Sequence, residues 1–243
     1  HIRPTSPMTL TAMLQRFGPD LAPRGTIVQA DPEPFESVAV NIWDLAGRAV
    51  AVAADGRTSI VWQRRLGYSD SQLAARAFDA AGAPLTEAEA LMSPGEPREW
   101  GVRDRSCAVV QGAGGGVVGW VHTAAVSSDS TGKVLARTFD ADLAFRGEPI
   151  EIAAAGRELR MAAHQDGSWT ALWIAPAERG DRQFAEHLFA RRFDANWQPL
   201  GTAVRLSGEA FRDALAPILP ESTGVPLHFL EIDVAAEPDG GFL

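Results

Sequence analysis

Lysine and cysteine are almost absent from this chain of 243 residues, with one of each. A single cysteine, Cys107, excludes an internal disulfide, and its apolar surroundings in 107–110 predict a buried, inert thiol rather than a nucleophile. A chain without disulfides suits the cytosol, and equally the outside of the cell if the core is large enough. The lack of cysteine therefore leaves the compartment open.

Positive charge and long apolar runs are also scarce. The net charge is −9, and an acidic surface disfavours non-specific binding to nucleic acid or anionic lipid. No stretch approaches the roughly 18 consecutive apolar residues of a membrane-spanning helix. The sequence therefore predicts no nucleic-acid partner and no membrane insertion.

The motifs of common catalytic and metal sites are missing too. None of the five histidines stands in a His-Glu-x-x-His arrangement, and no Cys-x-x-Cys, Gly-x-Ser-x-Gly or phosphate-binding loop occurs. We therefore expect no metal site and no cofactor, although a central channel could hold an ion.

What the chain does contain is a repeat. A short phrase ending in phenylalanine occurs four times, at spacings of 61, 61 and 54 residues, and a turn-forming tail follows each copy. A second landmark keeps step with it at spacings of 58, 53 and 56 residues. Fixed long periods are the mark of a repeat architecture. The first landmark is Phe17, Phe78, Phe139 and Phe193, and the second is Trp62, Trp120, Trp173 and Phe229.

Each unit has the pattern of four short antiparallel strands. Asp55-Gly56 and Asp166-Gly167 separate apolar runs, which is a strong hairpin signal because glycine accepts the positive φ of the turn. Four such strands in about 55 residues are the size of one propeller blade.

The two ends of the chain complement each other. The first phenylalanine has no tryptophan hairpin before it, and Phe229 has no Arg-x-Phe phrase after it. We therefore predict an all-β, four-bladed β-propeller, closed by an N-terminal strand that joins the C-terminal blade; an open linear stack is the alternative. Residues 1–7 are interpreted as a tag or linker remnant, and 8–243 as a single domain. Its blades are predicted at about 37–93, 94–153, 154–208, and 209–243 plus 8–30.

The pattern Asp-Gly, Trp, Arg-x-Phe-Asp-Ala-x-Gly-x-Pro-Leu-Gly, clearest in 55–85 and 166–201, resembles the degenerate propeller-type repeats of bacterial secreted and cell-surface proteins. The resemblance implies a propeller fold and a secreted or cell-envelope location, with a cytoplasmic one still open. It transfers no catalytic residue, because turn formers and core aromatics carry it.

Three aromatic residues precede the first strands of their units: Trp43, Trp100 and Phe211 lie 18 to 20 residues before the second landmark. Loops at strand ends on one face of a ring are where propellers place binding groups. The alternative is that these aromatics pack between blades. The predicted ligand-binding residues are Trp43, Asp44, Glu99, Trp100, Arg105, Arg160, His164 and Phe211.

Two functions fit this pattern. In the first, which we favour, the protein is a binding module that recognises a glycan or a protein partner through one face of the propeller. In the second, it is an enzyme with acid–base groups at the mouth of the central channel. The strong divergence of the loops favours one asymmetric site, and this supports the enzyme. Its candidate groups are Asp44, Glu99, Asp104, Arg105, Arg160 and His164.

Overall fold

The computed structural model describes residues 8–10, 12–32, 35–37, 48–65, 71–90, 103–112, 114–123, 131–140, 144–176, 186–207, 232 and 234–235. In this part of the chain every regular element is a strand, and no helix could cross a membrane. The strands are β1 (Met8–Leu10), β2 (Met13–Phe17), β3 (Pro23–Gln29), β4 (Phe35–Ser37), β5 (Arg48–Val52), β6 (Thr58–Arg65), β7 (Ser71–Phe78), β8 (Glu89–Ala90), β9 (Arg103–Gly112), β10 (Gly115–Thr123), β11 (Gly132–Asp140), β12 (Phe145–Ala163), β13 (Trp169–Pro176), β14 (Glu186–Phe193) and β15 (Val204–Arg205).

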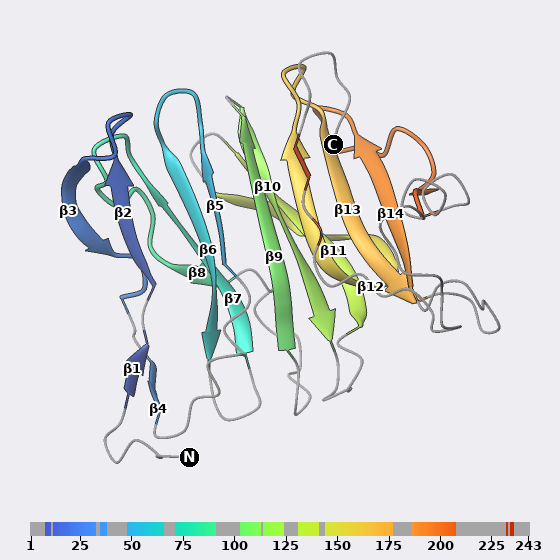
Figure 1. Cartoon of the computed structure of the whole chain (residues 1–243), viewed down its shortest axis with the longest axis horizontal. Coiled ribbons are helices and arrows are strands. Elements are labelled where there is room, and N and C mark those ends of the chain that lie inside the picture. Colours follow the sequence, from blue (N-terminus) through green and yellow to red (C-terminus); the bar gives the residue numbers. More distant parts are fainter. Residues whose placement is uncertain are drawn as a thin grey trace, which may run out of the picture.

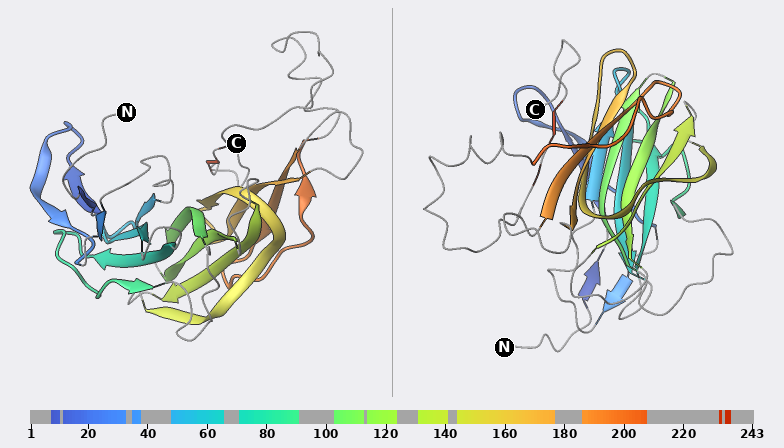
Figure 2. Two further views of the ribbon diagram at one scale, coloured as in Figure 1. Left: turned by 90° about the horizontal axis from the view of Figure 1, so that it is seen from below. Right: turned by 90° about the vertical axis from the view of Figure 1, so that its right-hand side faces the viewer.

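The strands form antiparallel units that follow one another along the chain. The first blade is β5–β6–β7–β8, the second is β9–β10–β11 with the first half of β12, and the third is the second half of β12 with β13–β14–β15. Before them stands the hairpin β2–β3, and β1 pairs with β4. The units stack in an arc, with β2–β3 at one end and β14 at the other (Figures 1 and 2).

The register of the strands confirms that the two sequence landmarks mark equivalent places. Phe78, Phe139 and Phe193 lie opposite Thr58, Gly116 and Trp169. Each of these three partners lies four positions before a residue of the second landmark, which is Trp62, Trp120 or Trp173. Trp62, Trp120 and Trp173 are buried, at 3%, 0% and 3% exposure. The prediction of a repeated blade is therefore confirmed for three units, while Phe229 lies outside the described residues.

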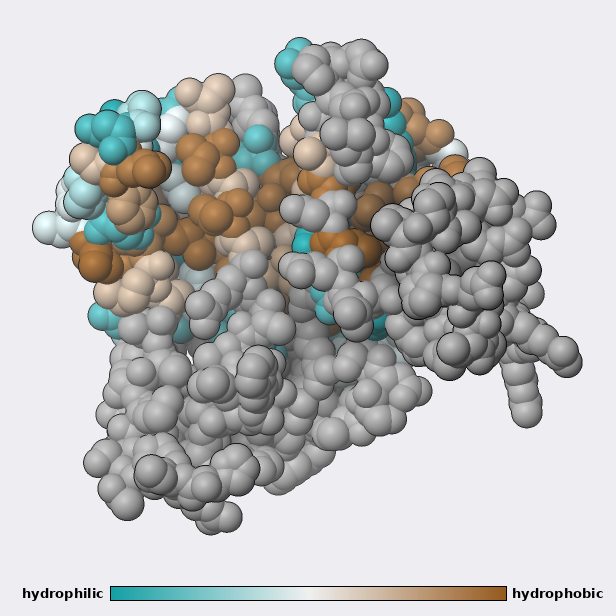
Figure 3. Space-filling view, viewed as in Figure 1, coloured by the Kyte–Doolittle hydropathy of each residue, from teal (hydrophilic) through white to brown (hydrophobic). Residues whose placement is uncertain are grey.

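Apolar layers between successive blades hold the arc together. Strand β13 shows the arrangement, because Trp169, Ala171 and Trp173 pack on the second blade while Leu172 and Ile174 pack on the opposite side. Side chains alternate between the two faces of a strand, so a strand that is apolar at every position must be covered on both sides. Figure 3 shows apolar residues gathered over these strands.

The arginine of each Arg-x-Phe phrase ties the third strand to the fourth. Its Nε donates to a backbone carbonyl ten residues later, at 2.9 Å from Arg76 to Thr86, 3.0 Å from Arg137 to Gly147 and 3.0 Å from Arg191 to Gly201. Arg76 and Arg191 also lie over the ring of the following phenylalanine. The partner that all three arginines share is therefore a backbone carbonyl.

The aspartate after the phenylalanine shapes the next turn. Asp79 Oδ1 accepts hydrogen bonds from the amides of Ala81 and Ala83, both at 2.8 Å, and Asp194 Oδ1 accepts two at the same positions of its turn. Such side chains stabilise turns by replacing backbone partners. The phrase Phe-Asp-Ala therefore specifies a turn.

Ring closure stays a prediction. Among the described residues β2 pairs only with β3, and 209–231, which carry the predicted inner strands of the fourth blade, lie outside them. The domain limits are predictions as well, since residues 1–7 are not described. The boundary that we expected between residues 153 and 154 falls inside the continuous strand β12.

Candidate functional site

The blades have two different ends, which we call the turn face and the loop face. At the turn face, β5 connects to β6 and β12 to β13 through five residues each, 53–57 and 164–168, whereas β9 connects to β10 through two, 113–114. In both five-residue connections the amide of the first residue donates a hydrogen bond to the carbonyl of the fifth. At the loop face, β6–β7, β10–β11 and β13–β14 are joined by five, eight and nine residues, 66–70, 124–131 and 177–185. A connection length is therefore repeated in two blades at the turn face, and no two of the three loop-face connections are equally long.

The segments that hold most of the predicted site join strands at the loop face. Residues 38–47 enter β5 at Arg48, and 91–102 enter β9 at Arg103. Both strand starts lie at this face, because Ser71 of β7 pairs with Arg103 and also with Arg65 at the end of β6. Trp43, Asp44, Glu99, Trp100 and Phe211 themselves lie outside the described residues.

The other predicted site residues are spread along the blades. Arg105 and Asp104 stand near the loop face on β9, paired with Val121 and His122. Arg160 is half-buried on β12, opposite Leu172. His164 lies at the turn face, just after β12. The structure therefore places His164 and Arg105 at opposite ends of the blades, and their roles as ligand-binding residues stay predictions.

A charged pair at the loop face of the third blade was not predicted from the sequence. Arg157 Nε and Nη2 donate to the two oxygens of Glu186 at 2.7 and 2.6 Å, and the two side chains are 18% and 17% exposed. Two parallel bonds between a guanidinium and a carboxylate are strong and fix both groups. The Glu186 carboxylate accordingly raises the pKa of Arg157 above its ordinary value, against the effect of burial.

The backbone beside this pair departs from a regular strand. Glu158 has a φ of 53°, in the left-handed region that side chains seldom adopt, and the register with β13 shifts between Arg157 and Arg160. The Glu158 carboxylate lies 3.7 Å from Arg160 Nη1. Left-handed non-glycine residues cost energy and cluster at functional sites. Four charged side chains therefore lie at a strained bulge on the first strand of the third blade: Arg157, Glu158, Arg160 and Glu186.

Glycine is required where β12 passes from the second blade to the third. Gly156 is buried, and a Cβ at this position would lie 2.6 Å from Val134 Cγ2 and 2.9 Å from Trp173 Cδ1. Both distances are shorter than van der Waals contact, so only glycine lets the strand cross here. Gly156 therefore fixes where Arg157 begins the third blade.

His164 has an unusual environment at the turn face. It is 6% exposed, its Nε2 lies 2.8 Å from Thr170 Oγ1, and its Nδ1 has no hydrogen-bond partner in the described part of the chain. Burial lowers the pKa of His164, the Arg192 charge lowers it further, and Asp166 opposes them. The ring is therefore neutral in the folded protein at pH 7.

This neutral histidine predicts a loss of stability in acid. The unfolded chain binds a proton at the ordinary pKa of 6.5, whereas the folded protein resists it. The free energy of unfolding should therefore fall as the pH drops from about 6.5 towards 5, and less so in His164→Gln. Urea unfolding of both proteins across this range, with pH 7–8 as the internal control, measures the difference. Equal slopes for the two proteins would contradict the assignment.

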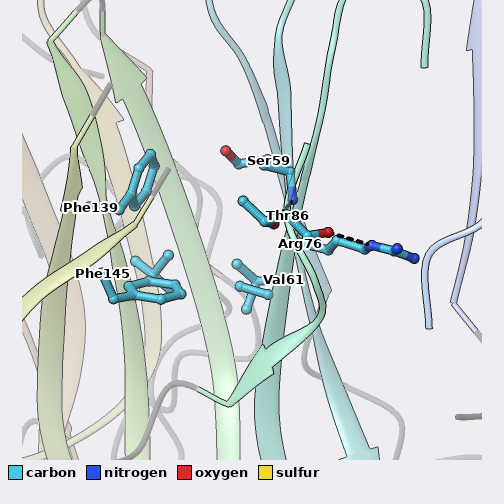
Figure 4. A pocket seen from close by; sticks show the side chains of 9 residues that line it. Ser59, Val61, Arg76, Thr86, Phe139 and Phe145 are labelled. Atoms are coloured by element: carbon cyan, nitrogen blue, oxygen red, sulfur yellow. Dashed lines mark hydrogen bonds between the residues drawn. The ribbon is translucent and has the colours of Figure 1, made fainter. Parts of the chain in front are cut away.

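A small cavity lies between the first and second blades, with a volume of about 20 Å³. Figure 4 shows the rings of Phe139 and Phe145 on one side and Ser59 and Val61 on the other, while Arg76 points away from it. The volume suffices for about one water molecule. We interpret the cavity as a packing gap, too small for an organic ligand.

The described residues offer no group of three histidine, cysteine or acidic side chains that could hold a metal ion. No protein-family model and no curated protein matches the sequence.

Several solved structures resemble the fold. One is a GH43_1 enzyme from Xanthomonas citri, with 13% identity and a TM-score of 0.46, covering 66% of this chain and 55% of that one. Another is an alpha-L-arabinofuranosidase from Lactobacillus brevis, with 10% identity, a TM-score of 0.46 and coverages of 67% and 53%. A third is the Dos1 propeller, with 10% identity, a TM-score of 0.49 and coverages of 97% and 48%.

The chain thus spans about half the length of these three structures. Similarity at this level concerns the fold alone. Strand pairing and the layers between blades define the class, an all-β fold built from propeller-type blades.

Proposed function

We propose that the protein is a binding module that recognises a glycan through the loop face of its blades. The observation that supports this is the difference between the two faces. The turn face repeats a five-residue connection in the first and third blades, whereas the loop face carries connections of five, eight and nine residues. Variable loops on a repeated, rigid scaffold are where binding residues concentrate.

The residue types in these loops suit a sugar. Trp43 stands beside Asp44, and Trp100 beside Glu99, in the segments that enter β5 and β9. A flat aromatic ring covers the apolar face of a sugar, and a neighbouring carboxylate accepts hydrogen bonds from its hydroxyls. Arg157 and Glu186 add a fixed polar group at the same face of the third blade. One asymmetric glycan site agrees with the divergence of these loops.

Replacing Trp100 with alanine tests this proposal. We expect binding to a glycan identified on an array to weaken at least tenfold, measured by calorimetry, because the stacking surface is lost. The free energy of unfolding should change by no more than about 1 kcal/mol, as for a surface residue. Trp100→Phe, which keeps a flat ring, is the matched control and should retain most of the affinity.

Other outcomes separate the alternatives. A loss of about 3–5 kcal/mol in Trp100→Ala would mean that Trp100 packs between blades. An array that binds no glycan would contradict the proposal in favour of a protein partner. Conversion of a bound glycan by the wild type, abolished in Glu99→Gln, would establish the enzyme instead, with Glu99 as its acid–base group.

A further inference from the structure

One end of the arc carries two apolar side chains, Val50 and Phe17, whose equivalents in the other blades are buried. Val50 of β5 pairs with Ile60, and Ile60 lies two positions before Trp62. In the next two blades Val109 and Met161 are equivalent to Val50, because each pairs with the residue two positions before Trp120 or Trp173. Val109 and Met161 are 8% and 9% exposed because each faces the preceding blade, whereas Val50 is 59% exposed. Val52, next on the same side of β5, is 62% exposed.

The hairpin β2–β3 shows the same difference. Phe17 ends the first copy of the repeated phrase and is 60% exposed, whereas Phe78, Phe139 and Phe193 are 0%, 4% and 2% exposed. Met13, on the same side of β2, is 53% exposed. We call Met13, Phe17, Val50 and Val52 the open end. Figure 3 shows apolar surface over the part of the molecule that holds β2, β3 and β5.

The shape of the open end matches two missing strands. β2–β3 cover only the second and third strands of the first blade, where Leu14 and Val28 pack against Trp62, Ala74 and Phe78. On this side of the first strand, β5, Val50 and Val52 are exposed. A blade whose third and fourth strands are β2 and β3 needs a first and a second strand, and these would lie directly over Val50 and Val52.

Residues 209–231 are predicted to supply these two strands, and the described residues that follow them lie at the other end of the arc. Ile232 is 8% exposed and packs with Leu172, Ile174 and Leu188 on the far side of the third blade, and Val234 packs beside it. Between the two ends stand the layers that join the blades (Figure 2). Closing one chain on itself would have to bend all of these packed layers, which are stiff.

We propose that the open end binds the C-terminal segment of a second copy of this chain, and that two copies close one ring. Each copy then covers the open end of the other, so the two contacts are identical and the assembly is finite, as expected of a two-fold symmetric oligomer. The contact buries Phe17, Val50 and Val52 and pairs the free edge of β2. It replaces the closure within one chain that we predicted from the sequence.

Light scattering on the purified full chain tests this directly. We expect a dimer of about twice the 25.9 kDa chain mass. The double variant Val50→Glu/Val52→Glu should be monomeric at the same concentration, because it places charges in the contact. The matched control is Leu200→Glu/Val204→Glu, two residues of equal exposure, 59% and 58%, on the outer part of the third blade, and it should stay dimeric.

Every other result would overturn the proposal. A monomeric wild type means that the chain closes on itself or stays open, and larger, concentration-dependent assemblies mean that two copies do not close a ring. A dimer that survives Val50→Glu/Val52→Glu, or that is lost equally in the control, places the contact elsewhere. Co-purification of two differently tagged wild-type copies, lost when both carry the β5 charges, checks the result if the double variant folds poorly.

Discussion

Replacing Trp120 with alanine is expected to lower the free energy of unfolding by about 3–5 kcal/mol. Trp120 has no exposed surface and lies in the apolar layer between the first and second blades, with Val61 and Leu73. The substitution leaves a cavity that rigid sheets on both sides cannot fill. Equilibrium unfolding in urea measures the loss, and Val204→Ala, at an exposed outer position, should stay within about 0.5 kcal/mol of the wild type.

Phenylalanine at two equivalent positions refines this test. Trp120 Nε1 is buried and has no hydrogen-bond partner among the described residues, whereas Trp62 Nε1 donates to Asp31 Oδ2 at 2.8 Å in the interior. Trp62→Phe removes that bond from a buried carboxylate and should therefore cost about 1–3 kcal/mol more than Trp120→Phe. Equal costs would contradict this difference between the two positions.

Repetition made the blades predictable from the sequence. Trp62 and Phe78 recur with their partners because each blade must present apolar residues to both neighbours, and this constraint repeats with the blade. The Asp-Gly hairpins were predictable for a local reason: Gly56 and Gly167 adopt φ values of 86° and 80°, which other residues avoid. The landmark residues and the Asp-Gly pair of one blade lie close together in the sequence, where a repeat can be recognised.

Features that depend on distant residues were not predictable. Arg157 and Glu186 are 29 positions apart and meet only because β12, β13 and β14 pair in one register. The continuity of β12 across two blades depends on the space beside Gly156, which Val134 and Trp173 define. The partners that Arg76, Arg137 and Arg191 share are backbone carbonyls. Every residue has a carbonyl, so the sequence does not show which one a side chain will contact.

The loops illustrate a different limit. Trp43 and Trp100 were selected because their distances to Trp62 and Trp120 are nearly constant, yet a constant distance is equally expected of a residue that packs between blades. Their neighbours Asp44 and Glu99 favour a polar environment. Spacing therefore identified the segments that adjoin the loop face, and it could not decide what their side chains contact.

Deletion of residues 1–17 is expected to abolish the cooperative unfolding transition, or to shift it by more than Trp120→Ala does. The deletion removes β2, so that β3 loses its partner and Trp62 and Phe78 lose the cover of Leu14. Each large apolar side chain returned to water costs about 1.5–3 kcal/mol, and an unpaired strand edge invites aggregation. Circular dichroism during urea unfolding measures the effect.

The matched control for this truncation is deletion of residues 1–7, the segment that we interpret as a tag or linker. It leaves β2 intact and should unfold at the same urea concentration as the full chain. If both truncated proteins unfolded alike, β2–β3 would not stabilise the first blade, and the layer around Trp62 would have to be held by other parts of the chain. The deletion of residues 1–7 also bears on assembly, because the ring of two copies requires Phe17 and the edge of β2, and this deletion keeps both. A dimer is therefore expected without residues 1–7.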